Sequence, residues 1–134
     1  RKYSIEKLEA IVDEVCNNLD KGIVTKCYEK NEEFHTTILS GCHNRPIISM
    51  IINLRERLYD FPQLDLAPVL KWERTFWDER RHIVDILRCG TAGELGDYFR
   101  KVHWSVEGKE EYWENLFNLP TGSVNQYITK RDEA

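Results

Sequence analysis

Apolar residues recur at intervals of three and four along most of the chain, the spacing that places them on one face of an α-helix. Ser4 is suited to cap the first helix, Gly22 to end it, and Gly90 to end the longest one. Helices are predicted over residues 5–20, 24–40, 46–58, 69–89, 92–106 and 110–118.

Prolines mark several boundaries between these helices. Pro46 suits a first helical turn, where its missing N–H is not needed. Pro62 and Pro68 argue against a continuous helix through the segment that they enclose. Residues 120–122 are predicted to form a turn, and residues 129–134 a frayed polar tail.

The composition supports one helical domain. The 134 residues are 41% apolar and include 4 Trp, 6 Tyr and 5 Phe, which is ample for a packed core. Only 7 Gly and 4 Pro are present, which favours helices over a turn-rich β architecture. We therefore predict an all-α fold, an antiparallel bundle of about six helices over residues 1–119, with a C-terminal extension or tail over 120–134.

The charge pattern argues against direct DNA binding by this segment. The net charge is −4 and the pI is about 5.6. A domain that binds the DNA backbone needs a basic face. Here acidic residues are interleaved with the Arg and Lys clusters at 71–81 and 100–101.

The cysteines and the apolar runs indicate a cytoplasmic protein. No two of Cys16, Cys27, Cys42 and Cys89 form a C-x-x-C pair, so free buried thiols are expected rather than a zinc or redox motif. No apolar run approaches the ~18 residues of a membrane span, and no secretory signal is visible. The chain does not begin with Met, so we expect a fragment or a processed product.

Polar residues at helical spacing are the first candidates for a ligand site. Asn31 and His35 lie four residues apart, so both project from one face of a helix. A surface Asn beside a partly buried His is the alternative. Arg80 shares a stripe with Ile83 and Leu87. On such a face it either pairs with an internal acid or holds the carboxylate of a ligand.

Other polar residues are weaker candidates. His103 follows an apolar stripe, where it is either a satisfied core histidine or a ligand contact. Arg55 is an outer candidate, with a solvated face as the alternative. His82 lies about 200° around its helix from Arg80, so the two side chains cannot line one pocket. The sequence contains no recognised catalytic or phosphate-binding motif.

Three blocks of the chain carry a family pattern. The first is Asn31-Glu32-Glu33-Phe34-His35, with Asn44 nine residues further on. The second spans 78–90, where Glu79-Arg80 precedes an apolar helical run, and the third runs from Gly96-Asp97 to His103. This order resembles the FCD family, the helical effector-sensing domain of GntR-type bacterial transcription regulators. That family reads Asp-x-x-Phe-His and an Asn, then Glu-His, Gly-Asp and a final His. The resemblance covers roughly residues 5–107.

The resemblance implies a metal site from which this chain departs. In the family an Asp and three His bind a divalent metal, commonly zinc or nickel, below a pocket for a small organic acid. Asn31 and Arg80 replace the Asp and the middle His, while His35 and His103 remain. The changes move the pocket by about two charge units toward positive, and Arg cannot coordinate a metal. We therefore expect Arg80 to attract an anionic effector without a cofactor. A metal at the degenerate pair of histidines is the weaker expectation.

The resemblance also implies a function. The chain is expected to be the effector-binding, dimerising part of a GntR-type regulator, without its N-terminal winged-helix domain. Its expected partners are a small carboxylate or sugar acid, a second copy in a homodimer, and DNA only through the absent domain, with no membrane. The predicted ligand contacts are Asn31, His35, Arg80, His103 and Arg55. Two other interpretations are a small helical enzyme that uses this cluster for acid–base chemistry, and a helical interaction module with no pocket.

Overall fold

The computed structural model describes residues 4–58 and 66–132, without the side chains of 55–58, 66–68, 127, 131 and 132. Within these ranges the chain forms seven α-helices and one π-helical segment, and no strand. The elements are α1 (Ile5–Asp20), α2 (Cys27–Leu39), α3 (Arg45–Leu58), α4 (Leu66–Cys89), α5 (Ala92–Tyr98), η1 (Phe99–His103), α6 (Glu110–Leu116) and α7 (Ser123–Asp132). The predicted all-α bundle is confirmed.

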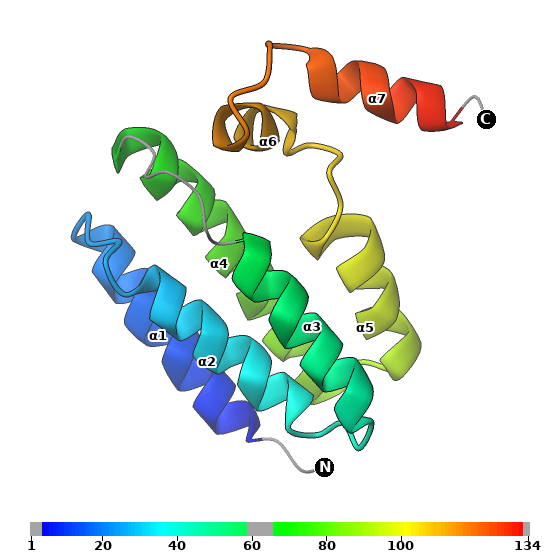
Figure 1. Cartoon of the computed structure of the whole chain (residues 1–134). Helices are drawn as coiled ribbons and strands as arrows, with labels where there is room; N and C mark the ends of the chain where they lie inside the picture. Colours follow the sequence, from blue (N-terminus) through cyan, green and yellow to red (C-terminus); the bar gives the residue numbers. More distant parts are fainter. Residues whose placement is uncertain (1–3, 59–65, 133–134) are drawn as a thin grey trace.

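The longest helix, α4, is central to the arrangement. It packs against α1, α5 and η1, and α1 also packs against α2. Figure 1 shows α1, α2 and α4 running alongside one another, with α6 and α7 at the end of the molecule away from the N-terminus. The bundle is therefore built around α4.

The core is formed largely by the apolar stripe of α1 and by aromatic residues of α2 and α4. The sequence predicted that stripe, and five of its residues are buried: Leu8, Ile11, Val12, Val15 and Leu19. Phe34 of α2 and Trp77 of α4 are fully buried and pack edge to face, with ring centroids 6.1 Å apart. Edge-to-face contact suits the quadrupoles of two aromatic rings.

A row of ion pairs lines the outer seam between α1 and α4. Three arginines of α4 recur every seven residues, and they pair with carboxylates of α1. The Nη atoms of Arg74 and Arg81 each lie 2.9 Å from a carboxylate oxygen, of Asp20 and Asp13 respectively. Arg88 pairs with Glu9. These side chains are about half exposed, so each pair contributes no more than about 1 kcal/mol to stability.

Several local predictions need correction. The helix predicted over 92–106 ends at Tyr98 and continues as the π-helical turn η1, which ends at His103. The predicted polar tail is also wrong in part, because α7 continues to Asp132. The segment around Pro62 lies mostly outside the described residues. Pro68, however, lies in the first turn of α4, where its missing N–H is tolerated.

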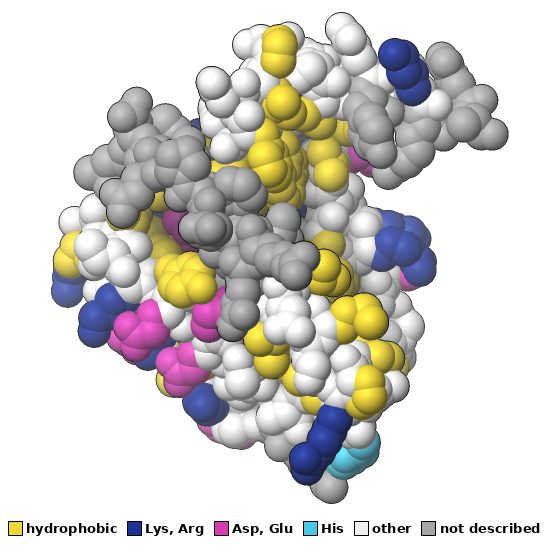
Figure 2. All heavy atoms as spheres, in the orientation of Figure 1, with side chains coloured by type: hydrophobic (Ala, Val, Ile, Leu, Met, Phe, Trp, Pro, Cys, Tyr) yellow, Lys and Arg dark blue, Asp and Glu magenta, His cyan; other side chains and the backbone are white. Residues whose placement is uncertain are grey.

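Some side chains are more exposed than the sequence suggested. The aromatic side chain of Tyr28, on α2, is 52% exposed. The apolar residues Ile47, Met50 and Leu54 of α3 are also exposed, and Figure 2 shows apolar side chains on this face of the molecule. The four cysteines are free, as predicted. Only Cys27 is buried; Cys16 is intermediate, and Cys42 and Cys89 are exposed. No helix in the described part of the chain is long and apolar enough to cross a membrane.

Candidate functional site

Four of the five predicted site residues are buried close to α4. Asn31 and His35 are 4% and 7% exposed on α2, Arg80 is 6% exposed on α4, and His103 is 9% exposed at the end of η1. The side chain of Arg55, on α3, lies outside the described part of the structure. Burial of four polar side chains from three elements is costly unless each is compensated.

Helical periodicity explains how α2 and α4 contribute these residues. Asn31 and His35 lie one turn apart and share the buried face of α2 with Phe34. On α4, Arg80 shares its face with the buried residue Ile83, as predicted. His82 is exposed and packs against Tyr98 of α5, with ring centroids 4.6 Å apart. His82 therefore takes no part in the cluster.

Direct contacts join these side chains in two pairs. A terminal nitrogen of the Arg80 guanidinium donates to Oδ1 of Asn31. The rings of His35 and His103 stack with centroids 5.6 Å apart and an angle of 25° between their planes. The His35 ring also packs edge-on against Phe34, at 5.6 Å. The cluster thus joins polar side chains of three elements in the interior, in contact with aromatic rings.

The guanidinium of Arg80 is stabilised by two further groups. Its central carbon lies 4.4 Å from the centre of the Trp77 ring, a cation–π contact. The side chain of Glu73, two turns earlier on α4, is partly buried, and its carboxyl group accepts a hydrogen bond from the indole N–H of Trp77, at 3.0 Å. Burial raises the pKa of Glu73, and the positive charge of Arg80 opposes that rise. Arg80 thus faces an internal acid whose ionisation is itself disfavoured.

A second network surrounds Glu79, the residue before Arg80. Nδ1 of His103 lies 2.8 Å from Oε2 of Glu79. Nζ of Lys109 lies 2.8 Å from Oε1 and 3.1 Å from Oε2 of the same carboxylate. Glu79 and Lys109 are 8% and 5% exposed. A carboxylate paired with an ammonium group accepts hydrogen bonds, so His103 donates through Nδ1.

His103 is held in its neutral form. Burial lowers the pKa of His103, and the positive charges of Arg80 and Lys109 lower it further, against the opposing effect of Glu79. A neutral imidazole that donates a hydrogen bond through Nδ1 keeps Nε2 free of a proton, so Nε2 can accept a hydrogen bond. The ammonium group of Lys109 also lies 3.0 Å from the backbone carbonyl oxygen of His103.

A buried thiol, that of Cys27, lies close to Glu73 and Arg80. Cys27 is 6% exposed and is hydrogen-bonded to Glu73. Burial and the nearby carboxyl group of Glu73 raise the pKa of the Cys27 thiol to about 12. At neutral pH the sulfur is therefore a thiol rather than the nucleophilic thiolate.

The donor set does not fit the metal site that the resemblance implies. Among the described residues, no group of three or more His, Cys, Asp or Glu side chains is placed to hold a metal ion. His35 and His103 are adjacent, but Nδ1 of His103 is engaged by Glu79, and two cations influence the His103 ring. A guanidinium where the family has a ligand opposes a bound cation electrostatically.

Three charged members of the cluster were missed from the sequence. Glu79 was noted only as a neighbour of Arg80, and Glu73 and Lys109 were not considered. Glu79 carried a usable signal, since it is an acid beside the buried stripe of α4. Lys109 carried none, because the π-helical turn and the loop that bring it back to α4 have no periodic pattern.

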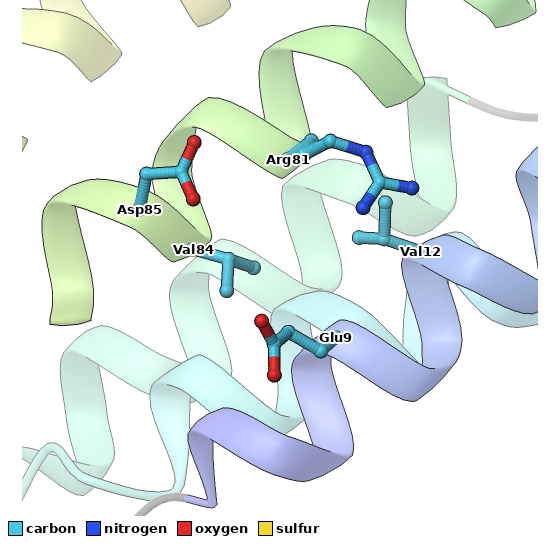
Figure 3. Close-up of a pocket in the computed structure, with 5 residues that line it drawn as sticks. All are labelled: Glu9, Val12, Arg81, Val84 and Asp85. Atoms are coloured by element: carbon cyan, nitrogen blue, oxygen red, sulfur yellow. The ribbon is translucent and has the colours of Figure 1, made fainter.

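A separate surface depression of about 70 Å³ lies between α1 and α4. Figure 3 shows that Glu9 and Val12 line it from α1, and Arg81, Val84 and Asp85 from α4. This volume holds only a few water molecules. The depression contains none of the predicted site residues.

Comparison with known proteins gives one match. The sequence model of the FCD domain matches residues 2–97, most of the chain. No curated protein and no solved structure matches. The matched range contains Asn31, His35, Glu79 and Arg80 and ends before His103. The chain therefore belongs to the FCD domain family, the regulatory, effector-binding domain of GntR-type transcription regulators.

Proposed function

We propose that the interior cluster binds a small organic acid, a carboxylate or sugar acid, and that Arg80 is its principal anion contact. The effector-binding role of the family supports this function. The observation that carries the proposal is the charge balance of the cluster. Among the described residues, Arg80 and Lys109 bring two buried cations to the cluster, and Glu73 and Glu79 bring two carboxyl groups, of which Glu73 has a raised pKa.

The surrounding groups suit a carboxylate. A guanidinium presents paired N–H donors that match the two oxygens of a carboxylate. The amide of Asn31 and the imidazoles of His35 and His103 supply further polar contacts of adjustable direction. Aromatic rings of Phe34 and Trp77 form the apolar side of the cluster. This mixture of apolar surface with a few directed polar groups is typical of small-molecule sites.

We further propose that the site works without a metal. In this hypothesis the fixed charge of Arg80 replaces the positive charge that a metal ion provides elsewhere in the family. Elemental analysis of untagged protein is the test, with His35→Ala as the comparison. One equivalent of a tightly held transition metal that is lost in His35→Ala would contradict the metal-free site.

The regulatory consequence is also a proposal. The domain would act in the cytoplasm as a homodimer, and effector binding would change how paired winged-helix domains meet their operator. This requires different effector affinities in the DNA-bound and free arrangements, because equal affinities shift no equilibrium. The domain then acts by binding rather than by turnover, in keeping with a regulatory family.

Titration calorimetry tests the binding site directly. Succinate and gluconate are the probes, with succinamide and sorbitol as uncharged matches. Loss of a hydrogen bond to a charged group costs about 1.5–3 kcal/mol, so Arg80→Gln should weaken binding by about tenfold or more. The control is Arg81→Gln, one residue away on the exposed seam. Equal affinity in both variants, or equal binding of charged and uncharged probes, would contradict the proposal.

A further inference from the structure

The carboxylate of Glu79 is shared between the candidate site and the start of α6. Its Oε2 accepts from Nδ1 of His103 at 2.8 Å, and its Oε1 lies 2.8 Å from Nζ of Lys109. His103 stacks on His35 within the site, whereas Lys109 immediately precedes α6. One buried side chain thus contacts both the site and the C-terminal part of the chain.

Lys109 also fixes the end of η1. Its ammonium group donates to the carbonyl oxygens of Val102 and His103, at 2.7 and 3.0 Å. The last carbonyls of a helix have no partner within it, and a cation there satisfies them and suits the helix dipole. Lys109 therefore holds η1, Glu79 and the first turn of α6 in one arrangement.

The helix α7 is attached to α6, so its position depends on that of α6. Tyr112 of α6 packs against Phe76 and Trp72 of α4, with ring centroids 4.9 and 5.5 Å apart. Oε1 of the buried Glu114 accepts from the backbone N–H of Val124 in α7, at 3.1 Å. Figure 1 shows α7 extending from α6 at the end of the molecule. These two helices lie beyond the range of the family match.

We propose that the Glu79–Lys109 pair couples the candidate site to the α6–α7 segment, so that an anion bound at the site holds this segment more firmly. The effector part of this inference rests on the proposed function. Lys109 is thus a positioning residue, which acts on the site through Glu79 and His103. The coupling is reciprocal: a firmly docked α6–α7 segment raises the affinity for the anion.

Electrostatics gives the direction of the effect. An anion in contact with His103 lies within range of both cations that act on that ring, Arg80 and Lys109. In an interior of low effective dielectric, added negative charge strengthens the retention of a nearby ammonium group. Lys109, and with it the start of α6, should therefore be released less often when the site is filled.

Hydrogen exchange of the full chain, read by mass spectrometry, tests the coupling without any ligand. The variants are His103→Gln, Lys109→Met and the double variant. The control is Lys101→Met, an exposed lysine on η1 that pairs with Asp97. His103→Gln should speed exchange over residues 110–132 about fivefold or more. In the Lys109→Met background it should add nothing, because the connection is already broken.

The two substitutions must therefore be non-additive. Additive effects would overturn the coupling. Faster hydrogen exchange of the α6–α7 segment in the Lys101→Met control would overturn it as well. If Lys109→Met does not fold, Lys109→Arg replaces it, since it keeps the charge but changes the geometry at Glu79. A purely structural role for Lys109 would not make the effect of His103→Gln depend on residue 109.

Succinate provides the second arm of the experiment. At a saturating concentration it should slow exchange over residues 110–132 about fivefold in the wild-type chain and leave Lys109→Met unchanged. Bound succinate with no such slowing would overturn the inference. Absence of succinate binding in calorimetry would count against the proposed function, while the ligand-free variants would still decide whether Glu79 and Lys109 couple the two regions.

Discussion

Arg80 and Arg81 are successive residues of α4, but their guanidinium groups lie in opposite surroundings. The Arg81 side chain is 46% exposed and pairs with Asp13 across the seam between α1 and α4. Arg80 is 6% exposed, packs against the Trp77 ring, and donates to the amide oxygen of Asn31. The first arrangement is a common surface ion pair, which adds little to stability.

The difference indicates that stability alone does not account for the buried arginine, Arg80. A buried cation must be compensated at every contact, and replacing such groups by apolar side chains is often neutral or stabilising. A chain that needed only a firm bundle would place a leucine at residue 80. Under the proposed function, ligand binding rather than folding accounts for the polar residues of the buried cluster.

The largest effect is expected for Lys109→Met. The substitution keeps an apolar stem but leaves the Glu79 carboxylate buried without its cation. Breaking a buried ion pair in this way costs about 3–5 kcal/mol. Chemical denaturation measures the loss. The double variant Lys109→Met/Glu79→Leu should recover most of it; a single variant as stable as the wild type would show that Glu79 is already solvated or protonated.

Arg80→Gln should cost less, about 1–3 kcal/mol. The substitution can leave Oδ1 of Asn31 without its donor, and an unsatisfied buried acceptor carries a penalty of that size. Removal of a buried charge offsets part of the loss. Chemical denaturation is again the measurement. A loss as large as that of Lys109→Met would mean that Arg80 is primarily a structural cation.

The pH dependence of stability distinguishes the interior cluster from the seam. Burial lowers the pKa of His103 in the folded state below its usual value of 6.5. The unfolded chain therefore binds this proton more readily, so the contribution of His103 is complete above about pH 6.5 and is lost as the pH falls below it. Denaturation at pH 7.5 and pH 5.5 should show less acid destabilisation in His103→Gln.

Glu73 contributes to the pH dependence of stability with the opposite sign. Burial raises its pKa in the folded state, so its contribution favours folding at low pH and is lost as the pH rises above its unfolded value. The two groups act in opposite directions. Acid destabilisation that is identical in the wild type and in His103→Gln would show that the histidine is not buried in its neutral form.

The smallest effect is expected for Arg81→Gln, a loss below about 1 kcal/mol. The pair with Asp13 is partly exposed, so salt screens it. In 1 M NaCl the stabilities of Arg81→Gln and the wild type should converge, as measured by denaturant titration. A loss that is large and insensitive to salt would remove the contrast between the seam and the cluster.

The sequence predicted those elements for which local periodicity decides the structure. The stripe of Leu8, Val12 and Val15 and the inward face of Arg80 both follow from 3.6 residues per turn, and both are confirmed. The π-helical turn that ends at His103 was missed, because the change of helix type has no signature in this sequence. The helix α7 was not predicted: residues 120–134 were interpreted as an extension or tail, frayed over 129–134 because that stretch is polar. The contact of α7 with Glu114 is made through tertiary structure.

The candidate site was only partly predictable for the same reason. The helical stripes and the family pattern marked Asn31, His35, Arg80 and His103. Lys109 reaches Glu79 across 30 residues, through a turn and a loop, and no spacing rule connects them. A long-range ion pair of this kind becomes visible only when the fold is known.

The most direct test of the central claim is electron density beside Arg80 in crystals of untagged protein grown with succinate or gluconate. The account predicts a carboxylate that contacts the Arg80 guanidinium and lies close to the His35 and His103 rings. It predicts no such density in Arg80→Gln and an unchanged site in Arg81→Gln. A transition metal held between His35 and His103, or a solid interior with the acid bound elsewhere, would contradict it.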